Sequence, residues 1–104
     1  MATVRLSGRA KADLLNIGAY TLRTWGEAQA ARYLDALEKC AKMLALNPVM
    51  GRNCDWIRPG LQRFENGRHV LFYRRRSGGI LVVRILHRSV LPDGRSFENE
   101  EPDA

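Results

Sequence analysis

The sequence predicts an α+β fold in which a helical hairpin packs on one face of a small antiparallel sheet. Three observations predict it. Apolar residues recur at helical spacing through residues 9–46, with one short break. Apolar residues then alternate along two runs joined by Asn66-Gly67, a strong signal for a β-hairpin. A short alternating run precedes the helices. The expected order is therefore strand, helix, helix, strand, strand, strand (β-α-α-β-β-β).

Length and composition are those of one soluble globular domain. A chain of 104 residues suffices for one domain but not for two. No segment reaches the roughly 18–20 uninterrupted apolar residues of a membrane span, and the N-terminus lacks the apolar core of a secretory signal. We therefore expect a cytoplasmic protein without a membrane partner. Cys40 and Cys54 stand far from His69 and His87 in sequence, so we expect no metal site, disulfide or cofactor.

The N-terminal strand and first helix come from residues 2–24. Residues 2–6 alternate like a strand, and Ser7 suits a helix N-cap. Residues 9–24 carry one apolar stripe at helical spacing. Gly26 can take the left-handed conformation that ends a helix.

The second helix is predicted from Glu27 to Leu46, and Asn47-Pro48 ends it because a residue before proline disfavours helix. The turn between the two helices is short, so the helices should lie antiparallel. Residues 47–60 look irregular, with Trp56 and Ile57 expected to pin them to the body.

The remaining strands are the clearest part of the pattern. Residues 61–65 and 68–75 should pair through a type I′ turn at Asn66-Gly67. A turn at residues 77–79 leads into the last strand, residues 80–87.

Alternation along the last strand assigns its two faces. It puts one set of side chains on one face, Leu81, Val83, Ile85 and His87, and a second set on the other, Val82, Arg84 and Leu86. If the helices cover the first set, Arg84 lies on the open face and His87 near the rim of the helices.

Charge is unevenly distributed. All 17 lysines and arginines lie in residues 1–95 with seven acids, a formal charge of +10, which we take as the domain. Residues 96–104 carry four acids and no base, and we expect them to form a mobile acidic tail. Ten arginines and no lysine stand between Arg52 and Arg95. Arginine pairs bidentately with phosphate or carboxylate, which favours an anionic partner, nucleic acid or acidic protein, over solubility alone.

Four segments then match a known family. Trp25–Tyr33 resembles its inter-helix turn, Ile57–Leu61 its entry into the sheet, Gly67–Arg74 its central strand and Val82–His87 its last strand. Together with the element order, they make residues 3–92 similar to the RelE/ParE toxin superfamily, and to its ParE branch in particular.

This resemblance implies the toxin component of a type II toxin–antitoxin system, which causes growth arrest. A ParD-like antitoxin would hold it inactive, and ParE-type members inhibit DNA gyrase. We expect such a binding protein, not an enzyme, with DNA contacted only through antitoxin or gyrase. Two alternatives stay open: a RelE-like, ribosome-dependent mRNA endoribonuclease, and a non-toxic relic that only binds antitoxin.

A ribonuclease would use Arg68, His87 and Arg88 in this sequence. Arginine is a poor proton donor, since its pKa lies above about 12, so His87 alone would carry the proton transfers. No tyrosine follows Tyr73, and we therefore expect no catalytic residues. We expect His87 to bond backbone or a carboxylate and His69 to lie on the hairpin surface.

Four aromatic residues are expected to serve packing: Tyr20, Trp25, Tyr33 and Trp56. The predicted partner-binding surface consists of arginines, namely Arg63, Arg68, Arg74, Arg75, Arg76, Arg84 and Arg88.

Overall fold

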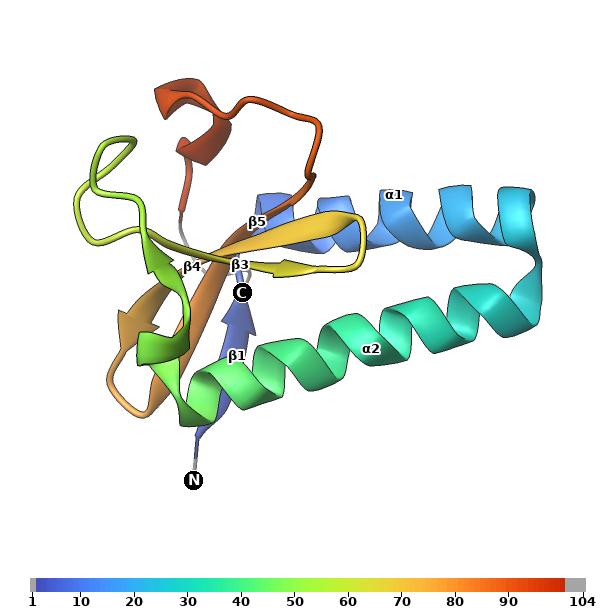
Figure 1. Cartoon of the computed structure of the whole chain (residues 1–104), viewed down its shortest axis with the longest axis horizontal. Helices are drawn as coiled ribbons and strands as arrows, with labels where there is room; N and C mark the ends of the chain where they lie inside the picture. The colour runs from blue at the N-terminus through green and yellow to red at the C-terminus, as the bar shows by residue number, and fades with distance from the viewer. Residues whose placement is uncertain (1, 101–104) are drawn as a thin grey trace.

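Two long helices lie against a five-stranded sheet in the computed structural model, which describes residues 2–100 (Figure 1). The helices are α1 (Gly8–Trp25) and α2 (Glu27–Leu46). The strands are β1 (Thr3–Leu6), β2 (Arg52–Asn53), β3 (Gln62–Asn66), β4 (His69–Arg76) and β5 (Gly79–His87). Two 3₁₀ turns complete it, η1 (Pro48–Met50) and η2 (Gly94–Phe97). The predicted α+β class and element order are confirmed, and no helix within residues 2–100 is long and apolar enough to cross a membrane.

The sheet has the strand order β1-β5-β4-β3-β2. Its pairs are antiparallel except β1 with β5, which are parallel. The expectation of a purely antiparallel sheet is therefore wrong at one edge. Two parallel strands must be joined by a long crossover connection, and the helical hairpin is part of the connection between β1 and β5. The two-residue strand β2 was not predicted, because two residues show no period.

Helix α1 begins where expected. The Ser7 hydroxyl accepts the Ala10 N–H at 3.0 Å and donates to the Val83 carbonyl at 2.6 Å. Ser7 is thus the N-cap and also fixes the start of the helix to β5. At the other end, Gly26 has φ +87°, which few other residues adopt readily.

The end of α2 is tied to the sheet by Tyr73. Its hydroxyl donates to the Pro48 carbonyl at 2.7 Å and accepts the Gly51 N–H at 2.9 Å. Between helices and sheet lies the larger core, which takes from the two helices Ala10, Ile17, Leu37, Ala41 and Leu44. The predicted helical stripes are therefore the buried ones.

The faces of β5 differ from the prediction because the strand contains a β-bulge. Phe72 pairs with Arg84 and Tyr73 pairs with Val82, so Val83 is an extra residue on β5. Ile85 consequently shares the helix side with Val82, while Val83 faces the other side. The strict alternation that grouped Ile85 with Val83 is wrong from the bulge onward.

The face away from the helices is covered as well. Cys54 and Leu61 from the loop before β3, and Phe97 from η2, form a second buried cluster with the outer face of β4 and β5. The Phe97 and Phe72 rings lie 5.0 Å apart, and Phe97 is fully buried. Phe97, which lies within the predicted acidic tail from Ser96, thus packs on the sheet, while Glu98 and Asn99 are exposed. Residues 101–104 of that tail lie outside the described part.

Two further expectations are corrected. Ile57 packs against the second cluster, but Trp56 is 73% exposed and pins nothing. The β3–β4 turn is centred on Gly67 and Arg68, since Asn66 pairs with His69. Gly67 alone has positive φ there (+61°), as a type II′ turn requires, so the predicted type I′ turn was one residue out of register.

Candidate functional site

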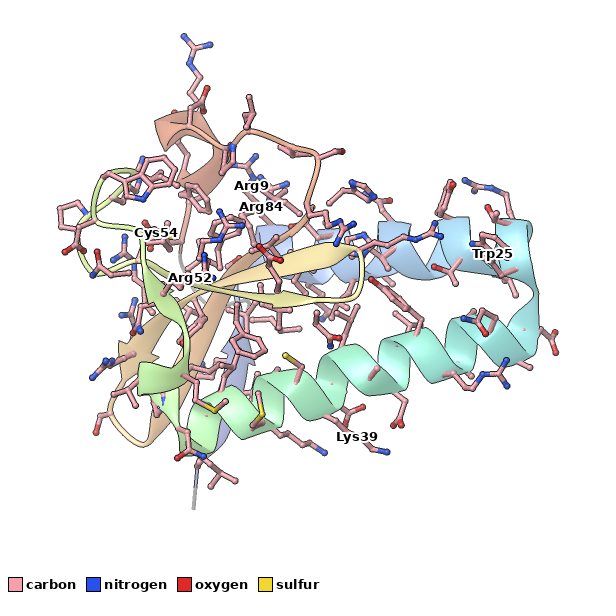
Figure 2. All side chains as sticks on the ribbon, in the orientation of Figure 1. Arg9, Trp25, Lys39, Arg52, Cys54 and Arg84 are labelled. Carbon is pink, nitrogen blue, oxygen red and sulfur yellow. The ribbon has the colours of Figure 1, made fainter. Side chains whose placement is uncertain are left out.

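A cleft of about 520 Å³ opens between the helical hairpin and the ends of β4 and β5. We call it the histidine cleft. Its walls come from α1, α2, the β3–β4 turn and two strand ends, and its lining residues are Asn16, Ile17, Tyr20, Thr21, Trp25, Gln29, Tyr33, Arg68, His69 and His87. The helices reach beyond the sheet (Figure 1), and the labelled Trp25 lies near the inter-helix turn (Figure 2).

Tyr33, His69 and His87 form the polar centre of the cleft. Tyr33 Oη lies 2.5 Å from His69 Nδ1 and accepts the Arg68 backbone N–H at 3.1 Å. His69 and His87 are register partners on β4 and β5, with ring centroids 5.5 Å apart at 84°. His87 Nδ1 lies 2.7 Å from Ser89 Oγ and accepts the Ser89 N–H at 3.1 Å. Each Nδ1 is thus engaged, and within residues 2–100 neither Nε2 has a hydrogen-bond partner.

Burial lowers the pKa of His69 from its ordinary value near 6.5. Electrostatic interactions with His87 and Arg68 lower this pKa further, and Asp13 opposes them weakly. His69 is therefore a neutral imidazole at neutral pH, held by a phenol on one nitrogen. A phenol that donates to Nδ1 leaves the ring proton on Nε2, which can donate a hydrogen bond to an anionic ligand in the cleft.

The mouth of the cleft is aromatic and cationic. Trp25 and Tyr20 are each 56% exposed. The Arg68 guanidinium lies 5.7 Å from the Trp25 ring centroid, a cation–π distance. Three of the four predicted packing aromatics, Tyr20, Trp25 and Trp56, are therefore exposed instead; only Tyr33 is half-buried.

The predicted ribonuclease residues are only partly brought together. Arg68 and His87 line the cleft, but Arg88 does not, and its backbone N–H donates to the Arg68 carbonyl at 2.9 Å. His87 accepts a backbone N–H, as expected. His69, expected on the hairpin surface, lines the cleft instead, because the one-residue shift of the turn places it in β4 opposite His87.

Three of the seven predicted partner-binding arginines are engaged inside the molecule. Arg84 forms a bidentate ion pair with Asp13 at 2.7 and 2.9 Å and donates to the Ser96 carbonyl at 2.9 Å. It lies near the labelled Arg9, under the C-terminal segment (Figure 2), and not on an open face. Arg74 pairs with Glu100 and bonds the Pro59 carbonyl. Arg63 pairs with Glu65 at 3.3 Å and lies over the Phe72 ring.

The other four arginines of that set are exposed: Arg68, Arg75, Arg76 and Arg88. Arg75 donates to the Gln62 side chain at 2.9 Å, and Arg76 bonds only the carbonyl of its neighbour among the described residues. These side chains present charge to solvent on the β3–β5 part of the molecule.

Sequence reasoning missed Tyr33, Trp25 and His69 as site residues. A signal for them existed in the lengths of the elements. A helix of 18 residues is about 27 Å long, which exceeds the width of a few strands side by side. The apolar stripes of the two helices therefore extend past the sheet at one end. Tyr33 and Trp25 belong to those ends. Neither could be paired with His69 without the turn register.

A second concave surface lies on another side of the hairpin. This groove of about 600 Å³, which we call the leucine groove, is mostly aliphatic and is lined by Val4, Leu6, Lys11, Leu14, Leu15, Leu34, Leu37, Glu38, Ala41, Lys42, Leu71, Val82 and Ile85. Leu15 on α1 is 70% exposed at this groove.

Neither concave surface supplies a metal centre. Among residues 2–100, no group of three His, Cys, Asp or Glu side chains could hold a metal ion. Cys40 and Cys54 are both free and buried, and burial raises the pKa of each thiol.

The fold is shared with a solved structure described as "Chromosomal ParDE TA system from P. aeruginosa". The two align with a TM-score of 0.69 and 20% identity, covering 84% of this chain and 96% of that one. A family model described as "ParE toxin of type II toxin-antitoxin system, parDE" matches residues 4–92. Fold and family together define the class: a toxin of a type II toxin–antitoxin system.

Relatives identify the family within that class. Toxin ParE1 of Caulobacter vibrioides is 41% identical over 90 residues, covering 86% of this chain and 93% of its own length. Toxin ParE1 of Mycobacterium tuberculosis is 44% identical over 84 residues, with 80% and 86% covered. Toxin ParE of Escherichia coli is 36% identical over 88 residues, with 84% and 85% covered. The chain belongs to the ParE toxin family, and the predicted resemblance is confirmed.

Proposed function

We propose that this toxin inhibits DNA gyrase by binding it, and that a ParD-like antitoxin neutralises the toxin. The family match supports both halves, since the family is that of the parDE systems. The observation in this chain that carries the antitoxin half is the leucine groove, an aliphatic surface of about 600 Å³ that no described segment covers.

The leucine groove suits the apolar face of an amphipathic helix. Leu14, Leu15 and Leu34 are among its walls, while Glu38 and Lys42 at its rim form an exposed i,i+4 pair. Helix-in-groove binding uses this combination of an apolar floor and a charged rim.

Leu15 and Leu46 make a matched test of the groove. Each is 70% exposed and helical, but only Leu15 lines the groove. Leu15→Glu should weaken antitoxin binding about tenfold or more, as measured by titration calorimetry, because a buried unpaired carboxylate would oppose docking. Leu46→Glu should change it less than twofold. Equal effects of the two substitutions would exclude the groove as the antitoxin site.

The exposed arginines supply the electrostatic part of the proposal. Arg75 and Arg76 lie at the end of β4, where acidic antitoxin side chains could pair with them. Double charge reversal at Arg75 and Arg76 should slow association with antitoxin and reduce its salt dependence. Reversal at the exposed Arg32 on α2 serves as the control. Unchanged affinity and salt dependence after the double reversal would refute the pairing.

To inhibit gyrase as proposed, the toxin has only to bind it and needs no residues that transfer protons. The groups at the strand ends that could transfer a proton are the imidazoles of His69 and His87. Arg88, which belonged to the predicted ribonuclease set, is not among the residues that line the cleft. We infer a protein that blocks gyrase without being an enzyme and stabilises the complex of gyrase with cleaved DNA.

A supercoiling assay tests this inference. Purified toxin should stop gyrase from supercoiling relaxed plasmid and should cause linear plasmid to accumulate, and added antitoxin should reverse both effects. Cleavage of ribosome-bound mRNA with supercoiling unaffected would instead support the endoribonuclease alternative. Absence of growth arrest on expression without antitoxin would support the relic.

A further inference from the structure

We propose that the histidine cleft binds one unpaired nucleotide of a nucleic-acid strand, with the base stacked at the aromatic mouth and the phosphate held by Arg68 and the histidines. This site is separate from the leucine groove and adds a direct nucleic-acid contact to a toxin otherwise proposed to act through protein partners.

Charge is the first observation. The described residues that line the cleft include Arg68, His69 and His87 and no aspartate or glutamate. Arg68 forms no ion pair within residues 2–100, whereas Arg63, Arg74 and Arg84 each have a carboxylate partner. A guanidinium without a carboxylate, beside two imidazoles whose Nε2 atoms have no partner in the described chain, is a site for an anion.

Exposed rings are the second observation. Trp25 and Tyr20 are more than half exposed on the walls of the same cleft, and Arg68 lies over the Trp25 face. Aromatic rings beside a guanidinium are the stacking platform that single-stranded nucleic-acid sites use, and each stacked base contributes appreciably to binding.

The composition of the walls favours a nucleotide over a protein helix. Ile17 is the one aliphatic side chain among the described lining residues, and the Asn16 and Gln29 amides can bond base edges. The leucine groove is the reverse, with aliphatic walls and charges at its rim. A volume of about 520 Å³ falls within the usual range for small-molecule sites, about 300–1,000 Å³.

Fluorescence anisotropy with the full-length toxin tests the site without gyrase or antitoxin. The probes are labelled single-stranded dT and U 12-mers and a 12-bp duplex. One or both single strands should bind, at least tenfold more tightly than the duplex, and the dT and U arms compare a DNA strand with an RNA strand. Because the assay contains no gyrase, its result is independent of the proposed function.

Substitutions in the cleft, each compared with a similar substitution outside it, test whether the oligonucleotide binds in the cleft. Trp25→Leu should weaken single-strand binding about tenfold, whereas Trp56→Leu, which removes a 73% exposed tryptophan outside the cleft, should change it less than twofold. Arg68→Gln should lower the slope of log Kd against log salt by about 0.7, the contribution of one phosphate contact on a single strand. Arg88→Gln, an equal charge change outside the cleft lining, should leave that slope unchanged.

Three results would overturn the proposal. One is no binding of either single strand, and another is equal loss of affinity from the cleft variants and their controls. The third is binding of an acidic, tryptophan-containing peptide that depends on Trp25 and Arg68 while the oligonucleotides do not bind, which would assign the cleft to a protein partner.

Discussion

Asp13 shows at the residue scale how one carboxylate joins three parts of the molecule. It accepts hydrogen bonds from the Arg84 guanidinium and from the Ile85 backbone N–H at 2.9 Å. Arg84 in turn holds the Ser96 carbonyl. Both side chains of the ion pair are only 13% exposed. Helix α1, strand β5 and the C-terminal segment thus meet at one ion pair.

Arg84→Met should destabilise the protein by about 3 kcal/mol in urea unfolding, because it leaves the Asp13 carboxylate largely buried without its cation. Lys39→Met is the control, since Lys39 points outward from α2 (Figure 2) and its pair with Asp35 is solvent-exposed. That substitution should have no measurable effect. Equal stability of the two variants would show that the Asp13 pair contributes nothing.

His69 should make stability depend on pH. Its pKa is lowered in the folded state by burial and by His87 and Arg68, so the unfolded chain binds the proton more readily. Stability should therefore rise with pH in the window just below about 6.5 and be level above it. Urea unfolding between pH 5 and 8 measures this slope, and His69→Gln should reduce it. A profile identical to that of the unsubstituted protein would contradict the inference.

At the scale of elements, the two hairpin turns of the sheet offer a comparison. Gly67 and Gly78 both have positive φ, at +61° and +78°. A Cβ at Gly67 would lie 3.0 Å from the Tyr33 ring, whereas a Cβ at Gly78 would meet nothing within 4 Å. The first turn is therefore packed on α2 and the second is free.

Gly67→Ala should cost more stability than Gly78→Ala, which should cost about 1 kcal/mol from backbone strain alone. The larger effect follows because Tyr33 would have to move away from His69. NMR titration should then show a changed His69 pKa in Gly67→Ala but not in Gly78→Ala. Equal losses of stability and an unchanged His69 pKa would show that the first turn does not position the histidine cleft.

Most helices and strands were predictable because their signals are local. Ser7 and Asn47-Pro48 mark the helix ends by capping and sterics, and the apolar stripes between them are long. The bulge at Val83 was not predictable, because period-2 alternation assumes an unbroken ladder. The parallel partner of β1 was equally hidden, since strand pairing is a tertiary property.

The candidate site was predictable in part for the same reason. Arg68 and His87 were expected together, and both line the histidine cleft. Tyr33 and Trp25 come from helix positions that looked like ordinary packing residues. Arg84 was misplaced on an open face because its partner, Asp13, is 71 residues away in sequence. Local charge counting cannot show which arginines are already paired.

At the scale of the whole molecule, the C-terminal segment acts as a second cover of the sheet. Arg58 bonds the Gly94 carbonyl at 2.9 Å and Arg9 the Arg95 carbonyl at 2.9 Å. Glu100 pairs with Arg74. Arginines predicted only to bind partners therefore also serve the fold, and the sheet is buried on both faces.

Phe97→Ala should destabilise the protein by about 3–5 kcal/mol, because the ring is fully buried against Phe72. Leu91→Ala in the same segment should have little effect, since Leu91 is 94% exposed. Thermal unfolding of both variants measures the difference. Similar melting temperatures would show that the segment is not part of the core.

Because β1 pairs with β5, the complete sheet can form only late in the synthesis of the chain. Thr3 pairs with Gly79 and Leu6 with Val82, so the first strand has no partner until most of the chain has been translated. The same late strand brings Arg84 to Asp13 and His87 to His69. A nascent chain that stops in β4 contains the helical hairpin but lacks the strand that completes sheet and cleft. A message truncated before that point therefore encodes a fragment without the completed sheet and without the His87 side of the histidine cleft.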